Sequence, residues 1–197
     1  MLNGLIRAPI TKILTPPARG LLRLGVTPNM VTATGAFGAA AAALILFPTG
    51  HLFGGTLTIA AFILSDLLDG TMARISGKSS RWGALLDSTL DRVGDSAIFG
   101  GLLIYYAQHD RILAVLAGVC LVSGGLVPYV KAKAESLGIA CGGGIAERAE
   151  RITAVLISTG LSGLGLSHIG AIGLWLIAVA TIVTFGQRMM QVWRSDV

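Results

Sequence analysis

Charged residues are scarce in this chain. Asp, Glu, Lys and Arg make up 13% of its 197 residues, about half of the ~25% found in an average soluble protein. Hydrophobic residues account for 53%, and the mean hydropathy is +0.76. A composition so poor in charge excludes an ordinary soluble domain and predicts an integral membrane protein.

Cysteines are scarce as well, and cations are not clustered. Two cysteines, Cys120 and Cys141, are too few for a disulfide framework. The net charge is +5, yet no basic cluster is interleaved with aromatic residues, so no nucleic-acid partner is expected. In a membrane protein an excess of Lys and Arg sets orientation and contacts anionic lipid head groups.

The N-terminal segment, residues 1–26, lacks the uninterrupted apolar run of a signal peptide, because three prolines break it. Its apolar residues recur at helical spacing, with Arg7 and Lys12 on the other side. This pattern predicts a juxtamembrane amphipathic helix that lies in the membrane interface.

Six apolar segments follow, each about as long as a bilayer-spanning helix requires. Thr27 is placed to cap the first of them, with Pro28 at the first helical position. The sequence contains no internal repeat. The sequence thus predicts an all-α integral membrane protein with six transmembrane helices, forming one domain over residues 27–197. The predicted spans are 28–47, 55–75, 82–107, 112–134, 146–165 and 169–193.

The basic residues support an even number of spans. With six spans, all the clusters fall on one side of the membrane, and the opposite loops carry only Arg111. The positive-inside rule makes the basic side cytoplasmic. We therefore expect a multi-pass protein of the cell (plasma) membrane with both termini in the cytoplasm. The clustered residues are Arg7, Lys12, Arg19, Arg23, Arg74, Lys78, Arg81, Lys131, Lys133, Arg148, Arg151, Arg188 and Arg194.

Four aspartates lie inside these apolar segments, where an ionised carboxylate is expensive. Asp66 and Asp69 are three residues apart, and Asp87 and Asp91 are four apart, so each pair shares a helix face. The pairs are symmetric about the turn 76–80. An antiparallel hairpin would therefore set them level, roughly 10–15 Å from the cytoplasmic turn at about 1.5 Å per residue.

Four converging carboxylates repel one another unless a cation joins them. Hard divalent ions prefer such oxygen ligands, and sites with two metals bind phosphates and stabilise phosphoryl displacement. The sequence predicts two divalent ions, Mg²⁺ with Mn²⁺ as the alternative, held by Asp66, Asp69, Asp87 and Asp91. The competing interpretation is acids at exposed helix ends.

Residues between the two pairs suit a phosphate ligand. Gly70, Ala73 and Gly83 are small and permit close approach to the backbone, although small residues also serve helix packing. Arg74 offers a planar cation, and Ser80 offers a hydroxyl. A positive-inside flank and turn chemistry are their simpler explanations.

The stretch resembles the CDP-alcohol phosphotransferase family, whose pattern is D-x2-D-G-x2-A-R-x8-G-x3-D-x3-D. It is matched here without departure by Asp66, Asp69, Gly70, Ala73, Arg74, Gly83, Asp87 and Asp91. The resemblance implies a CDP-diacylglycerol donor, divalent metal and a homodimer. It also implies that Asp66, Asp69 and Asp87 hold one ion and that Asp66, Asp87 and Asp91 hold the other. Asp91 would be the catalytic proton acceptor.

The stretch "TPNMVT" begins the first predicted span, where backbone N–H groups are free to meet an anion. The family resemblance implies that Asn29, Met30, Val31 and Thr32 contact the CDP moiety, together with Gly70, Arg74 and Ser80. Helix capping alone would also explain Asn and Thr at these positions.

The acceptor alcohol is suggested by cations at the predicted ends of spans four, five and six. An acceptor that carries its own phosphate needs several cations, whereas free inositol does not. The chain resembles the actinobacterial-type phosphatidylinositol phosphate synthases, which use inositol 1-phosphate. That resemblance implies Lys131, Arg151 and Arg188 as ligands of the acceptor phosphate, with Arg194 as the alternative to Arg188.

Two other functions fit parts of the pattern. A phosphatidylglycerophosphate synthase would use the same cations for glycerol 3-phosphate. A divalent-cation transporter also places paired acids in its spans, but such folds often show internal repeats, and it has no need for the glycines and Arg74 at these spacings. The favoured prediction is phosphatidyl transfer from CDP-diacylglycerol to inositol 1-phosphate, with release of CMP.

Overall fold

The computed structural model describes residues 14–77 and 80–195, apart from the side chain of Asp66. Residues 14–23 are helical, whereas most of the predicted interfacial helix, residues 1–13, lies outside the described part. All regular structure in the described residues is helical. The helices are α2 (Pro28–Leu46), α3 (Leu52–Leu64), α4 (Asp66–Ser76), α5 (Arg81–Ala107), α6 (Arg111–Ser136), α7 (Arg148–Gly163) and α8 (Ser167–Ser195).

The predicted segments correspond to these helices, with one difference. The predicted start of α2 is confirmed, because Thr27 accepts a hydrogen bond from the Met30 N–H at 3.3 Å and Pro28 follows it. The segment predicted as one helix over 55–75 consists of α3 and α4, which meet at Ser65. There the Ser65 N–H and hydroxyl both donate to the Phe62 carbonyl, at 3.0 and 2.6 Å. Both hydrogen bonds, from the hydroxyl and from the backbone N–H, reach the carbonyl three residues earlier. They tighten the turn and interrupt the α-helix.

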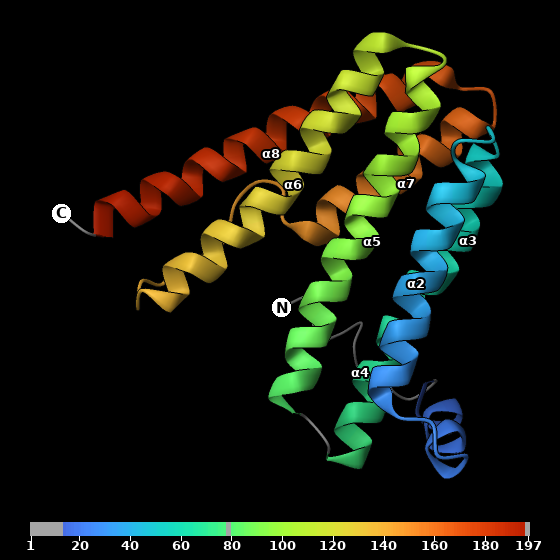
Figure 1. The fold of residues 1–197 in the computed structure, drawn as a ribbon, viewed down its shortest axis with the longest axis vertical. Coiled ribbons are helices and arrows are strands. Elements are labelled where there is room, and N and C mark those ends of the chain that lie inside the picture. Colours follow the sequence, from blue (N-terminus) through green and yellow to red (C-terminus); the bar gives the residue numbers. More distant parts are fainter. Residues whose placement is uncertain (1–13, 78–79, 196–197) are drawn as a thin grey trace.

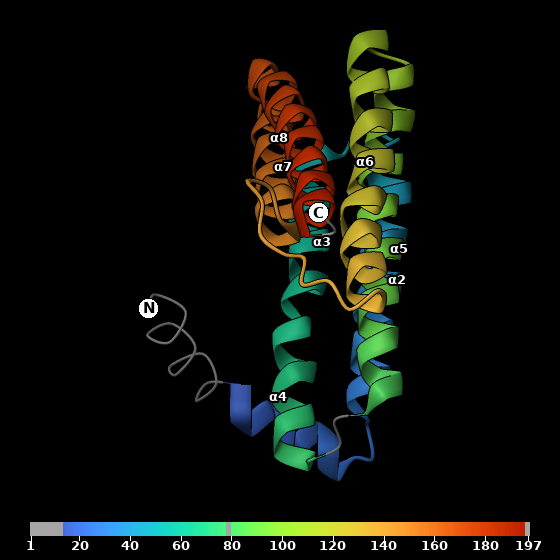
Figure 2. The same cartoon turned by 90° about the vertical axis from the view of Figure 1, so that its left-hand side faces the viewer.

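Six of these helices, all except α4, form two layers that close into a ring. Figure 2 shows α2, α5 and α6 on one side and α3, α7 and α8 on the other. Around the ring, α2 packs on α5, α5 on α6, α6 on α8, α8 on α7, α7 on α3 and α3 on α2. α4 extends beyond α3 and packs mainly on α2. The C-terminal ends of α6 and α8 incline away from α4 (Figure 1).

Small residues let α2 approach its neighbours closely. A Cβ at Gly35 would lie 2.2 Å from Ser65 Oγ, and one at Gly101 of α5 would lie 2.3 Å from the Ala43 carbonyl oxygen. Real Cβ atoms do not come so near to other heavy atoms. Glycine at these two places therefore fixes the spacing of α2 against the α3–α4 junction and against α5.

The outer surface of the bundle is apolar. Along α8, Leu176, Val179 and Ile182 are each more than half exposed, whereas Thr181 and Arg188 of the same helix are buried. A long exposed apolar stripe is unfavourable in water and suits a lipid environment. Four helical segments of the described residues are long and apolar enough to cross a membrane: Pro28–Leu46, Leu52–Ser76, Arg111–Ser136 and Ser167–Ser195.

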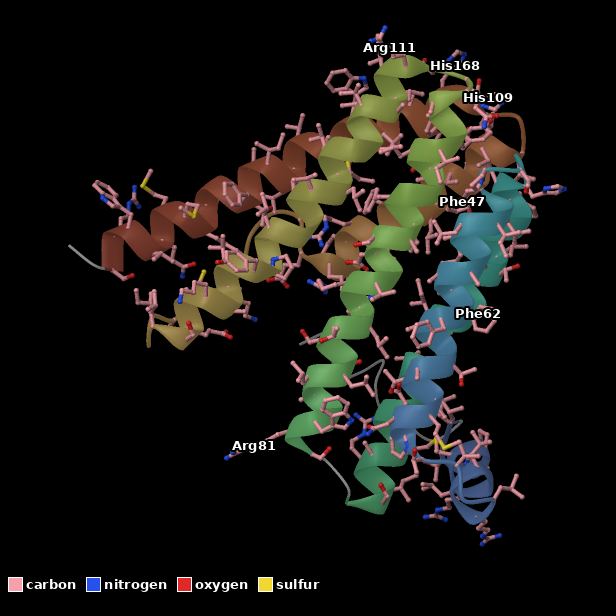
Figure 3. The ribbon with its side chains drawn as sticks, viewed as in Figure 1. Phe47, Phe62, Arg81, His109, Arg111 and His168 are labelled. Atoms are coloured by element: carbon pink, nitrogen blue, oxygen red, sulfur yellow. The ribbon has the colours of Figure 1, made fainter. Side chains whose placement is uncertain are left out.

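Polar residues lie at both ends of the bundle. Figure 3 shows Arg81 at the end where α5 begins, and His109, Arg111 and His168 together at the opposite end. Phe47 is fully buried between these ends. α5 and α7 are less apolar than the four candidate spans, because several charged residues lie on them, among them Asp87, Asp91, Arg148 and Arg151.

Candidate active site

An acidic cavity of about 440 Å³ opens between α2, α4 and α5. Asp69 reaches it from α4, and Asp87 and Asp91 reach it from α5. The predicted convergence of the two aspartate pairs is thus confirmed for these three residues. Its setting differs from a simple hairpin, because α4 packs mainly on α2. The start of α2 therefore forms one wall of the cavity.

Asp69 is the most buried of the three carboxylates, with 8% of its surface exposed. Its Oδ2 accepts a hydrogen bond from the Thr32 hydroxyl on α2. Buried carboxylates require such donors, because desolvation penalises an unpaired negative charge. Thr32, predicted as a nucleotide contact, is thereby also a residue that orients a predicted metal ligand.

The other residues predicted to contact CDP-diacylglycerol divide into two groups. Asn29, Gly70 and Ser80 line the acidic cavity with Thr32. A Cβ at Gly70 would meet nothing within 4 Å, and the Ser80 hydroxyl accepts from the Gly83 N–H at 2.9 Å, which caps α5. Met30, Val31 and Arg74 are not among the lining residues. The Arg74 guanidinium donates to the Thr71 hydroxyl at 3.1 Å.

The side chains of the acidic cavity offer the oxygen ligands that a hard divalent ion prefers. Asp69, Asp87 and Asp91 offer only oxygen ligands, which Mg²⁺ and Mn²⁺ prefer. Among the side chains that the structure describes, which do not include that of Asp66, no three acidic, histidine or cysteine groups are close enough to form a metal site. Asp66, whose side chain is not among those described, is the fourth carboxylate of the predicted set.

A second cavity, of about 390 Å³, is basic and lies between α5, α6, α7 and α8. It is lined by Lys131, Arg151 and Arg188, the three residues predicted to bind the acceptor phosphate. Arg194 is instead near the end of α8, at a separate surface hollow. The structure thus brings the three predicted cations together, although they come from three helices.

Two of these cations are held by backbone carbonyls. Pro128 has no N–H, so the carbonyl of Gly124 lacks its usual helical partner, and Arg151 Nη2 donates to that oxygen at 3.4 Å. Arg188 Nη1 donates to the Val127 carbonyl at 2.8 Å. Arg151 and Arg188 are 2% and 5% exposed. Their guanidinium groups are therefore fixed in place beside the proline of α6.

The two cavities meet at Asp91 and Arg148, the two residues that line both. Arg148 Nη2 lies 2.9 Å from Asp91 Oδ1, and Arg148 Nε lies 3.0 Å from Asp95 Oδ1. The bridging guanidinium compensates two carboxylates that burial would otherwise leave unfavourably charged.

The sequence indicated Arg148 only as one of several cations that could surround a cavity beside the metals, and it indicated no role for Asp95. Asp95 continues the four-residue series of Asp87 and Asp91 on one face of α5, so a signal was present. Arg148 was visible only as one cation among several at the start of α7. Its position against Asp91 depends on how α7 packs.

Comparison with known proteins gives a consistent set of relatives. The sequence model of the CDP-alcohol phosphatidyltransferase family matches residues 25–190. The phosphatidylinositol phosphate synthase of Streptomyces avermitilis is 46% identical over 205 residues, covering all of this chain and 84% of the relative. The enzyme of the same name from Mycobacterium tuberculosis is 45% identical over 196 residues, covering 97% and 90%.

Solved structures agree with the sequence relatives. The crystal structure of the Mycobacterium tuberculosis phosphatidylinositol phosphate synthase with CDP-DAG bound has a TM-score of 0.89 and 45% identity to this chain, and the match covers 92% of this chain and 94% of that one. The same synthase in complex with manganese and citrate has a TM-score of 0.88 at 45% identity, covering 91% and 88%.

Proposed function

Because this chain belongs to the CDP-alcohol phosphatidyltransferase family, we propose that it is a phosphatidylinositol phosphate synthase. It transfers the phosphatidyl group of CDP-diacylglycerol to a hydroxyl of inositol 1-phosphate and releases CMP. The observation that carries the proposal is the meeting of an acidic and a basic cavity at Asp91 and Arg148. The names of its relatives support the same reaction.

The acidic cavity takes the nucleotide end of the donor. Asn29, Thr32, Gly70 and Ser80 line it, and we assign Met30, Val31 and Arg74 to the same ligand from the family pattern. Asp66, Asp69, Asp87 and Asp91 hold two divalent ions, Mg²⁺ or Mn²⁺. Bound there, the ions supply Lewis-acid stabilisation of the diphosphate oxygens. A related synthase crystallised with manganese supports this cofactor.

The basic cavity takes the acceptor. Lys131, Arg151 and Arg188 line it and are assigned to the phosphate of inositol 1-phosphate. A phosphate held there leaves the polyol free to extend toward Asp91, at the junction of the two cavities. Asp91 removes the proton of the attacking hydroxyl as general base. The hydroxyl oxygen then forms a bond to the lipid-bearing phosphorus, and the bond from that phosphorus to CMP breaks.

The setting of the reaction is a membrane. We propose six transmembrane helices over one domain, residues 27–197, preceded by a juxtamembrane interfacial segment, residues 1–26, in a homodimeric protein of the plasma membrane. The termini and the active site face the cytoplasm. The four long apolar segments and the apolar face of α8 support a membrane-integral chain. A lipid donor and a polar acceptor require a site that contacts both lipid and water.

The test is an acceptor comparison with radiolabelled CDP-diacylglycerol, Mg²⁺ and the purified chain. Inositol 1-phosphate is expected to give labelled phosphatidylinositol phosphate with stoichiometric CMP. Glycerol 3-phosphate and free inositol serve as competitors at equal concentration. Preferred use of glycerol 3-phosphate would make the chain a phosphatidylglycerophosphate synthase, and equal use of free inositol would overturn the role of the basic cavity. If no acceptor gives CMP release, transferase activity is refuted, and metal transport by the chain becomes the alternative to measure.

A further inference from the structure

Asp95 is a buried carboxylate outside the family pattern. It lies on α5 one helical turn after Asp91, and 6% of its surface is exposed. Placing a carboxylate at such a position is costly unless cations or donors compensate it. Its partners are two arginines of α7: Arg148, at 3.0 Å from Oδ1, and Arg151, at 3.7 Å from Oδ2.

Each of the two arginines belongs to the site already described. Arg148 lines both cavities and its Nη2 contacts Asp91 at 2.9 Å. Arg151 lines the basic cavity and is bonded to the carbonyls of Gly124 and Ala146 at 3.4 and 3.2 Å. Asp95 therefore contacts one cation at the junction of the cavities and one inside the acceptor cavity.

Asp95 supplies the negative charge that the backbone carbonyls around Arg151 lack. Carbonyl oxygens orient the Arg151 guanidinium but do not neutralise it, and Asp95 is the carboxylate paired with it among the described residues. Arg148 could rotate wholly toward Asp91 if its Nε had no partner. With Asp95 in place, the guanidinium of Arg148 is held between two carboxylates on successive turns of α5.

We propose that Asp95 is a positioning residue for the acceptor. It anchors the Arg148 guanidinium at the junction of the two cavities and balances the charge of Arg151, so that Arg151 is already in place when the phosphate of the incoming polyol binds. A preorganised pair of cations binds more tightly than one that must be assembled. This inference rests on the proposed function, because it assumes an acceptor phosphate in the basic cavity.

The experiment compares Asp95→Asn and Asp95→Glu with the parent, as full chains purified in detergent. Steady-state kinetics are measured in each substrate at saturation of the other. Asp95→Asn removes the charge and is expected to raise KM for inositol 1-phosphate about tenfold. Asp95→Glu restores the charge on a longer side chain and is expected to raise it about threefold. KM for CDP-diacylglycerol is expected to stay within twofold of the parent in both.

A double variant tests the route through Arg148. If Asp95 acts by holding Arg148, Asp95→Asn combined with Arg148→Gln should raise the acceptor KM little more than the worse single variant does. Coupled residues show such non-additivity. The matched control is Asp110→Asn, because Asp110 Oδ1 caps α6 by accepting from the N–H groups of Ile112 and Leu113 at 2.9 and 3.1 Å. Asn can still accept these bonds, so Asp110→Asn should leave both KM values unchanged.

Two results would overturn the inference. One is a parental acceptor KM in a folded Asp95 variant, and the other is an equal rise of both KM values, which would reduce Asp95 to a general support of the fold. If Asp95→Asn does not fold, Asp95→Glu is judged by the same criteria. A parent that makes no product from inositol 1-phosphate would instead refute the proposed function.

Discussion

Lys131 offers the cleanest test of the acceptor cavity. Its side chain is 47% exposed, and its ion pair in the described structure is a 3.9 Å contact with Glu135, one turn along α6. Such an exposed pair contributes about 0–1 kcal/mol to stability. Arg151 and Arg188, in contrast, are buried and bonded to backbone carbonyls. Removing either arginine would disturb the fold as well as the ligand.

The expected effect of Lys131→Ala follows from the bond it would make. A hydrogen bond between a charged group and a phosphate contributes about 1.5–3 kcal/mol. The half-exposed position of Lys131 in the cavity selects the lower end, because solvent screens the interaction. About 1.5 kcal/mol corresponds to roughly a tenfold weaker interaction. We therefore expect KM for inositol 1-phosphate to rise about tenfold, with an unchanged KM for CDP-diacylglycerol.

The assay measures release of CMP against the concentration of each substrate, on protein of matched yield and melting temperature. Lys133→Ala is the control, since Lys133 is an exposed lysine of the same helix that does not line the cavity. It should leave both KM values unchanged. A parental acceptor KM in Lys131→Ala, or an equal weakening of acceptor use in Lys133→Ala, would refute a contact between Lys131 and the acceptor phosphate. Either result would return Lys131 to the role of a topology signal.

Three further predictions concern the metals, the base and the packing. Asp87→Ala should abolish Mg²⁺-dependent CMP release while the chain still inserts into membranes; substantial residual turnover would contradict the assignment to both ions. Asp91→Asn keeps a ligand oxygen but cannot accept a proton, so turnover should be nearly lost. Binding of CDP-diacylglycerol, measured with labelled substrate, should be largely retained. An equal loss of binding would make Asp91 chiefly a metal ligand. Gly101→Ala should lower stability by about 1–3 kcal/mol, seen as a reduced melting temperature in detergent, because its Cβ would collide with the Ala43 carbonyl oxygen. Gly125→Ala is the control, since its Cβ would meet nothing within 4 Å, and an equal loss in both would argue against the close α2–α5 contact.

The helices themselves were predictable from local pattern. Apolar segments of sufficient length, the Thr27–Pro28 start of α2 and the polar breaks between segments are properties of neighbouring residues. The interruption at Ser65 was not predictable, because the apolar pattern continues through it. It depends on the hydroxyl of Ser65 bonding to the Phe62 carbonyl where α2 crosses at Gly35.

The acidic cavity was predictable in part. The spacing of Asp66, Asp69, Asp87 and Asp91 placed the carboxylates on two helix faces on either side of one turn, and three of them do line one cavity. The involvement of α2 through Thr32 was foreseen only by resemblance to the family. Its hydrogen bond to Asp69 joins two helices that no local periodicity relates.

By itself, the sequence determined that this chain is helical and apolar, where most of its apolar segments lie, and which carboxylates share a helix face, since these follow from spacing within about one turn. Only the tertiary structure decided that Arg148 bridges Asp91 and Asp95 and that Arg151 and Arg188 converge with Lys131 on one cavity. Those contacts join residues on different helices. The physical reason is that their distance depends on which helix faces interlock, just as Gly35 and Gly101 set the contact of α2 with its neighbours.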